Sequence, residues 1–275
     1  MTDITIIKPK TNFFHVDIAQ LLKWRFLFYL MTRRNVKILY QNTAIGVLWV
    51  VLQSFLTVIV FSFLLKRIGG GIDANGIPYI LFAFSGILLW QGFSKALTQA
   101  GGSLIAQQGI ITKVFFPRLL VPGSTVASVG VDLIANFIFY GAVFIFYGVT
   151  PNILAPLGLV FLLLALVIAF FMSLIICAIS LRYRDAQLIL PFLLQIGQFL
   201  TPVFYPISAI PSKWHFVVAL NPIASIAELT RWSTLQNYPF PSFLVLTSSF
   251  ISTLVIAIIG VYLFNKNDRY IAELL

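Results

Sequence analysis

Charged residues are scarce in this sequence: Asp, Glu, Lys and Arg make up 9% of the 275 residues, against about 25% in a typical soluble domain. Hydrophobic residues make up 60%, and the mean hydropathy is +0.98. A soluble fold of this length still exposes much of its chain to water, so it could not hide this much apolar surface. The composition therefore excludes a soluble protein and indicates a membrane protein.

Cysteine, histidine and acidic residues are also rare: the sequence has one cysteine (Cys177), two histidines and eight acidic residues. One cysteine excludes a disulfide within the chain, and no Cys/His spacing typical of a zinc site is present. The sequence has no GxSxG, no Gly-rich phosphate loop ending in GK[ST], and no acidic pair placed for sugar chemistry. We therefore expect no catalytic site, no metal site and no cofactor on this chain.

Long uncharged runs make up most of the remaining sequence. In lipid, only helices and closed barrels satisfy every backbone hydrogen bond. These runs exceed the ~10 residues of a barrel strand and do not alternate polar with apolar residues, whereas a spanning helix needs about 20 residues. The predicted fold class is all-α integral membrane, with six transmembrane helices near 44–65, 78–97, 119–147, 153–181, 186–204 and 242–264.

Two segments between these helices are too short or too broken to span. Residues 101–118 are polar and contain glycine and proline, which predicts a short surface helix. Residues 205–241 are apolar but contain five prolines, so we expect short helices at 212–220 and 222–235. Their low charge favours re-entrant extracytoplasmic helices between the fifth and sixth spans, and an ordinary extracytoplasmic loop is the alternative.

The positive charges predict the orientation of the chain. With the N-terminus inside, 14 of the 18 Lys and Arg residues lie on the cytoplasmic side, as the positive-inside rule requires. The net charge of +10 then reflects cytoplasmic loops and contacts with anionic membrane lipids, and we expect no nucleic-acid partner. Residues 1–275 form one membrane domain, with a cytoplasmic tail and interface helix at 1–43, the membrane part at 44–264 and a cytoplasmic tail at 265–275.

An N-terminal amphipathic helix is predicted at residues 17–40, where apolar residues recur at helical spacing and basic residues lie between them. Such a helix lies in the cytoplasmic interface and anchors the topology. Its surface can in addition dock a cytoplasmic partner or hold an anionic lipid headgroup, and the sequence leaves these roles open. Its basic residues include Lys23, Arg25, Arg33, Arg34 and Lys37.

Two predicted spans carry a stripe of aromatic and amide side chains at helical spacing. Polar amides inside a membrane need a partner or a wet cavity. The stripes therefore predict either a channel surface along which sugars slide, or helix packing with satisfied amides. The candidate channel-lining residues are Trp49, Gln53 and Thr57 at 44–65, and Phe192, Gln195 and Phe199 at 186–204.

A polar stripe also runs along the predicted span at 119–147, where Ser128, Asp132 and Asn136 follow one another every four residues, between Ser124 and Tyr140. Asp132 is the only carboxylate expected inside the membrane, which by default suggests function. A proton relay would need further titratable partners in the membrane, and the sequence offers none. A hydrogen-bonded seam between helices or subunits is the favoured interpretation.

Four segments follow one another in a characteristic order along the chain: 33–49 (RRNVKILYQNTAIGVLW), 181–185 (LRYRD), 201–206 (TPVFYP) and 219–222 (ALNP). With them, essentially the whole chain resembles the permease subunits of type-2 ABC transporters that export polysaccharides such as O-antigen, capsule and teichoic acid. Asn35 and Asn42 depart from the most familiar pattern without affecting the resemblance.

The resemblance implies an assembly of two copies of this chain, which form a channel, and two copies of a separate ATP-binding subunit, which holds the ATP and Mg²⁺. The N-terminal helix and residues 100–118 would touch that subunit, and the turn at 182–185 would be a smaller contact. The implied coupling residues are Gln107, Lys113, Arg118, Arg182, Arg184 and Asp185.

The resemblance also implies a cargo, a glycan on a polyprenyl diphosphate lipid. Basic residues at the cytoplasmic entrance would meet the diphosphate, since opposite charges match there. The entrance residues are Arg25, Arg33, Arg34 and Lys37. The extracytoplasmic gate would include Tyr205, Pro206, Trp214, Asn221 and Pro222.

The sequence thus predicts a permease subunit of an ATP-driven exporter, with polysaccharide and foremost O-antigen as cargo, in the bacterial inner membrane. Two alternatives stay open. An ion- or proton-coupled secondary transporter would work without an ATPase and would depend strongly on Asp132. A membrane glycosyltransferase using polyprenyl-linked sugars would transfer sugar by itself, and would need an acidic pair that this sequence lacks.

Overall fold

The computed structural model describes residues 18–41, 43–68 and 77–268. Expectations about the chain before residue 18, about Asn42, about the glycines at 69–71 and about the chain after residue 268 lie outside the described residues. Within the described ranges every regular element is a helix, which confirms the all-α class.

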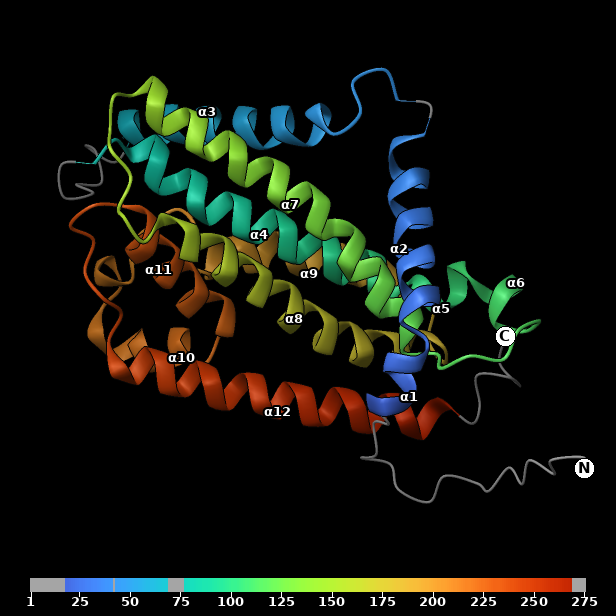
Figure 1. The fold of residues 1–275 in the computed structure, drawn as a ribbon. Coiled ribbons are helices and arrows are strands. Elements are labelled where there is room, and N and C mark those ends of the chain that lie inside the picture. Colours follow the sequence, from blue (N-terminus) through green and yellow to red (C-terminus); the bar gives the residue numbers. More distant parts are fainter. Residues whose placement is uncertain (1–17, 42, 69–76, 269–275) are drawn as a thin grey trace, which may run out of the picture.

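Four long apolar helices form the body of the molecule and lie side by side (Figure 1). They are α4 (Tyr79–Gly101), α7 (Leu120–Phe146), α8 (Ala155–Ser180) and α12 (Phe243–Asp268), and each is long and apolar enough to cross a membrane. Helix α4 is central: it packs against both α7 and α8, and every residue from 80 to 90 is buried. A helix that is apolar all round is suited to such a position.

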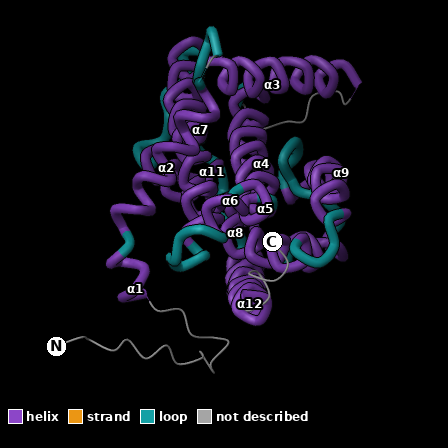
Figure 2. Tube along the Cα trace, turned by 90° about the vertical axis from the view of Figure 1, so that its right-hand side faces the viewer, coloured by secondary structure: helices purple, strands orange, loops and turns teal. Residues whose placement is uncertain are grey.

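Two shorter apolar helices flank this body and pack against α4: α3 (Leu48–Ile68) and α9 (Asp185–Leu200). Figure 2 shows them on the same side of the bundle, at its periphery. The sequence predicts that the second of them continues to residue 204, and this is wrong. Helix α9 ends at Leu200 because Thr201, with ψ of 143°, is extended, as expected for a residue that precedes a proline.

One end of the bundle, here called the α2 end, carries four short or crossing helices. They are α1 (Ile18–Lys23), α2 (Arg25–Tyr40), α5 (Ser103–Ala106) and α6 (Gln108–Ile111). Helix α2 runs across the long helices instead of along them (Figure 1) and packs on α7. The predicted amphipathic helix at 17–40 is therefore present, but it is divided at Trp24.

The opposite end, here called the α11 end, holds the helices between α9 and α12. They are the 3₁₀ turns at Ile207–Ala209 and Ser212–Trp214, α10 (His215–Ala219) and α11 (Pro222–Thr234). Helix α11 begins as predicted, because Pro222 occupies its first turn and the Asn221 side chain accepts a hydrogen bond from the Ile223 amide. It packs against α8, α12 and α4, while α10 packs on α12.

Candidate functional site

An ion pair joins two of the long helices. Lys95 Nζ of α4 lies 2.5 Å from Asp132 Oδ2 of α7; the Asp132 side chain is 3% exposed and the Lys95 side chain 31%. The sequence predicts that the first of these helices ends at 97 and so places Lys95 at the membrane surface. Helix α4 instead continues to Gly101, so Lys95 lies inside the helix and reaches Asp132.

The other side chains of the polar stripe on α7 donate to backbone carbonyls, whereas the buried Asn136 Oδ1 has no hydrogen-bond partner among the described residues. The hydroxyl of Ser128 donates to the Thr125 carbonyl at 2.6 Å, and the Asn136 amide donates to the backbone carbonyl of Asp132 at 3.1 Å. Tyr140 donates to the Leu81 carbonyl of α4 at 3.0 Å. Two contacts of the stripe, Asp132 with Lys95 and Tyr140 with the Leu81 carbonyl, cross to α4, and its carboxylate thus has a cationic partner that the sequence did not reveal.

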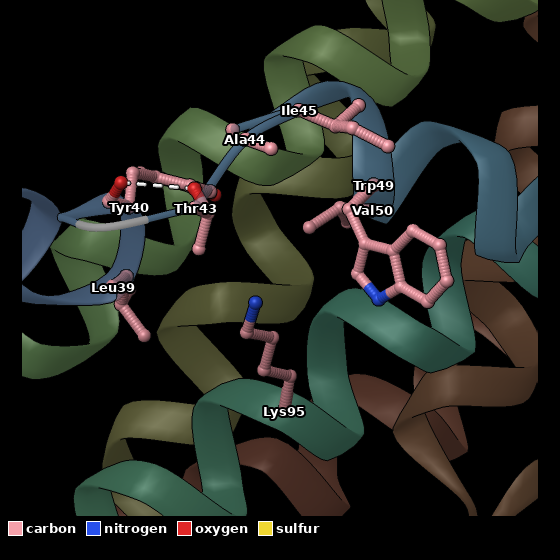
Figure 3. Close-up of a pocket in the computed structure, with 9 residues that line it drawn as sticks. Leu39, Tyr40, Thr43, Ala44, Ile45, Trp49, Val50 and Lys95 are labelled. Atoms are coloured by element: carbon pink, nitrogen blue, oxygen red, sulfur yellow. Dashed lines mark hydrogen bonds between the residues drawn. The ribbon is translucent and has the colours of Figure 1, made fainter.

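A cavity lies beside this ion pair, beneath the loop that joins α2 to α3. Its volume is about 390 Å³, and its walls are Leu39, Tyr40, Thr43, Ala44, Ile45, Gly46, Trp49, Val50 and Lys95. The loop turns sharply at Gly46, whose φ of +59° suits glycine. Figure 3 shows Lys95 extending from α4 toward the loop, with the Trp49 ring on the same cavity.

The four predicted entrance residues are all exposed on α2: Arg25, Arg33, Arg34 and Lys37. The structure does not gather them at one point. Arg25 opens the helix and Lys37 is in its last turn, which separates them by roughly 18 Å of helix rise. The cavity lies at the Lys37 end, so Arg25 belongs to a different part of this surface.

The predicted channel stripes lie on outer faces of α3 and α9. Trp49 is 58% exposed and Phe192 is 62% exposed; Gln53, Gln195 and Phe199 are exposed and Thr57 is half-buried. A stacked aromatic cluster connects the two helices near the α11 end, with Phe61 4.0 Å from Phe204 and Phe199 5.8 Å from Phe204 between ring centroids. The amides of Gln53 and Gln195 are thus not packed between helices of this chain.

The predicted coupling residues all lie at the α2 end, on two separate segments. Lys113 is exposed in the segment after α6, where Phe115 is 84% exposed. Gln107 and Arg118 are half-buried in the same region. Arg182 and Arg184 are exposed in the turn between α8 and α9, and Asp185 is exposed at the first position of α9.

The predicted gate residues are at the α11 end and are linked to the end of α9. Tyr205 donates to the Phe199 carbonyl at 2.9 Å, and the Asn221 amide donates to the Thr201 hydroxyl at 2.8 Å. Trp214 is 52% exposed. Pro206 and Pro222 directly precede or begin the helical turns of this region.

A second ion pair, on α11, holds this end together. Arg231 is fully buried, with Nη1 3.0 Å from Glu228 Oε1 and Nη2 2.6 Å from the Val203 carbonyl oxygen. Its guanidinium lies 3.8 Å from the centre of the Phe82 ring. The Tyr238 hydroxyl donates to Glu228 at 2.9 Å, and burial raises the pKa of Tyr238 above its usual range.

Comparison with known proteins decides the family. Residues 26–235 match the family described as ABC-2 type transporter. This chain belongs to the ABC-2 type transporter family. The match confirms the resemblance to type-2 ABC permeases, and it makes this chain a multi-pass membrane transport subunit of a family whose members are not themselves the ATPase.

Individual members of the family are similar over most of this ABC-2 chain. An O-antigen export system permease protein RfbA of Klebsiella pneumoniae is 28% identical over 255 residues, which is 90% of this chain and 95% of the relative. RfbA of Myxococcus xanthus is 28% identical over 212 residues, covering 76% and 80%. The polysialic acid transport protein KpsM of Escherichia coli is 22% identical over 250 residues, covering 86% and 91%.

Two functional candidates of this ABC-2 transporter were missed in the sequence. The predicted helix end at 97 places Lys95 at the membrane surface, although the apolar pattern continues to Ala100 and extends the helix past it. Arg231 lies in the segment 205–241, which the sequence predicts to be extracytoplasmic, although Glu228 three residues earlier is at the spacing of an intrahelical pair. In both cases the partner of the cation lies on another turn or another helix, which a count of charges along the chain does not show.

Proposed function

We propose that this chain is the membrane subunit of an ATP-driven exporter. The exporter moves a polyprenyl-diphosphate-linked polysaccharide from the cytoplasm across the bacterial inner membrane, and O-antigen is the favoured cargo. The observation that carries the proposal is the similarity over 90% of the chain to a protein named as an O-antigen export permease. The absence of any expected catalytic motif in the sequence agrees with a role in transport.

The proposal includes six crossings of the membrane with both termini in the cytoplasm. In addition to the four long helices, α3 has 21 residues, about 31 Å of helix, and α9 has 16 residues followed by the extended 201–204 segment. The α2 end is then cytoplasmic, in keeping with the concentration of Lys and Arg there. Helices α10 and α11 form a re-entrant pair at the outer end, supported by the buried face of α11.

A second copy of this chain is proposed to complete the channel. The outer faces of α3 and α9 carry exposed aromatic side chains together with the amides of Gln53 and Gln195, and an amide that faces lipid is costly. A partner copy placed against these faces would give the amides of Gln53 and Gln195 a wet passage. Trp49, Phe192 and Phe199 would then offer ring faces to the sugars of the cargo.

Energy is proposed to come from two copies of an ATP-binding subunit, which holds the ATP and Mg²⁺. The ATP-binding subunit would bind at the α2 end, to the exposed segments around Lys113 and around Arg184. The basic residues of α2 would meet the lipid diphosphate on the same side of the membrane, so that cargo enters where ATP is hydrolysed.

Reconstitution tests this proposal. The chain is incorporated into vesicles together with its ATP-binding subunit, and ATP hydrolysis and the movement of polyprenyl-diphosphate-linked polysaccharide are measured. We expect movement only when both subunits and ATP are present, and none with a partner whose phosphate-binding lysine is replaced. Movement by this chain alone, driven by a pH gradient, would instead support the secondary transporter and overturn the proposal.

A further inference from the structure

The cavity under the α2–α3 loop combines apolar walls with one cation. Leu39, Ile45, Trp49 and Val50 contribute apolar surface, and Lys95 is the only charged side chain among the nine lining residues. No carboxylate lines the cavity. A site of this composition accepts a ligand that is apolar over most of its surface and anionic at one end.

Asp132 holds the Lys95 ammonium in place and uses only part of its hydrogen-bonding capacity. An ammonium group has three N–H donors, and the 2.5 Å contact with Asp132 Oδ2 uses one of them. The Lys95 side chain keeps 31% of its surface exposed. The remaining donors can therefore serve an anion in the cavity while the ion pair stays formed.

Two further observations concern the neighbourhood of this cation. The hydroxyl of Tyr40, another lining residue, is buried and has no hydrogen-bond partner among the described residues, which is an energetic cost until a partner arrives. Arg33, Arg34 and Lys37 are exposed on the part of α2 that leads into the loop. Their positive field would concentrate anions at the mouth of the cavity.

We propose that this cavity binds the diphosphate end of the lipid-linked cargo. Lys95 contacts the diphosphate directly, and Asp132 is a positioning residue that holds Lys95. The inference rests on the proposed function and assigns the contact to α4 instead of to the arginines of α2, which attract the headgroup first. The polyprenyl chain leaves along Ile45 toward the exposed apolar face of α3, where Leu48, Leu52 and Leu56 are accessible. Lysine is suited to this task because it binds phosphate as a point charge.

Calorimetric titration of the purified full-length chain in detergent tests the site. Farnesyl diphosphate is the probe, with farnesol and inorganic diphosphate as separate arms. We expect farnesyl diphosphate to bind, and farnesol and inorganic diphosphate to bind at least tenfold more weakly, because the cavity recognises both parts of the lipid. Equal binding of inorganic diphosphate would overturn a lipid site and indicate one for free phosphate.

Lys95→Gln is expected to weaken farnesyl diphosphate binding by about tenfold or more, through loss of a charge-assisted contact. The single variant leaves Asp132 buried without a cation. The double variant Lys95→Gln/Asp132→Asn removes both charges and is therefore expected to fold more stably than the single variant, and to bind the probe as weakly. Lys95→Arg keeps the charge and is expected to bind within a few-fold of the original chain.

Lys213→Gln is the matched control, since Lys213 is exposed at the α11 end and its loss removes the same charge; we expect unchanged affinity. Original affinity in both Lys95→Gln and the double variant would overturn the site. That result leaves ATP-driven export in vesicles intact, whereas failure of export by the original chain with its ATPase would overturn the proposed function itself.

Discussion

Arg231 donates a hydrogen bond from Nη2 to the carbonyl oxygen of Val203, at 2.6 Å. The bond connects α11 to the short segment that follows α9. The same guanidinium lies over the ring of Phe82 in α4, so three parts of the chain that are distant in sequence meet at one buried cation. A buried charge is tolerated when it is paired and hydrogen-bonded, and Arg231 finds these partners in Glu228, Val203 and Phe82, although its Nε has none among the described residues.

Arg231→Met is expected to destabilise the protein by about 3–5 kcal/mol, because it leaves the Glu228 carboxylate buried without its cation. Thermal unfolding of the purified chain in detergent measures the loss. The double variant Arg231→Met/Glu228→Gln removes both charges and is expected to recover most of the stability. If Arg231→Met alone unfolded at the original temperature, the buried pair would have no structural role.

Gly86→Ala is expected to destabilise the same region by about 1–3 kcal/mol through overpacking. An added Cβ would overlap the Val203 carbonyl oxygen and lie 2.9 Å from Arg231 Nη2. Gly141→Ala is the control, since nothing lies within 4 Å of its Cβ position; it is expected to be neutral or stabilising, because alanine favours helix. Equal unfolding temperatures for the two variants would contradict the close approach at Gly86.

Phe192→Ala is expected to reduce polysaccharide movement in reconstituted vesicles at least a few-fold, while changing the free energy of unfolding by no more than ~0.5 kcal/mol. The reason is that Phe192 is 62% exposed and packs little within the chain. Phe250→Ala, on the outer face of α12 and 71% exposed, serves as the comparison and should transport normally. Equal transport by the two variants would remove Phe192 from the channel surface.

Phe115→Ser is expected to weaken association with the ATP-binding subunit and to lower ATP hydrolysis by the complex. Phe115 is 84% exposed at the α2 end, where a soluble partner can cover it. Phe146→Ser changes an equally exposed phenylalanine, also 84%, at the other end of α7. Co-purification should be lost only for Phe115→Ser, and loss in both variants would indicate misfolding rather than a docking surface.

Lys113→Cys and Lys213→Cys test the orientation of the chain. Both positions are exposed, at opposite ends of the bundle, and the native Cys177 is 1% exposed and so is protected from labelling. In intact cells, after the outer membrane is made permeable, a membrane-impermeant maleimide should label only Lys213→Cys. Labelling of Lys113→Cys alone would reverse the proposed topology.

The positions of the helices could be read from the sequence with small errors. The predicted spans at 119–147 and 153–181 correspond to α7 and α8 within two residues at each end, because glycine and prolines separate two long apolar runs. Errors arose at helix ends, such as residues 201–204 after α9, where one residue preceding a proline stops the helix. Such ends depend on local backbone geometry, which hydrophobicity does not report.

The proposed site could be predicted only in outline. The sequence shows the polar stripe around Asp132 by its four-residue spacing and the basic residues of α2 by their charge. It does not show the cavity or the contact between Lys95 and Asp132. Residues 95 and 132 are on different helices, and their pairing depends on which faces of α4 and α7 meet. No periodicity within either helix contains that information.

The helical membrane class, the places of the long helices and the resemblance to a transporter family follow from the amino-acid order alone, because apolar runs and motif order are local properties. The pairing of Lys95 with Asp132, the burial of Arg231 against Val203 and the cavity under the α2–α3 loop depend on how the helices pack. Burial and ion pairing depend on residues from other parts of the chain, because a charge inside a membrane protein is tolerated only when helix packing places an oppositely charged or hydrogen-bonding group beside it.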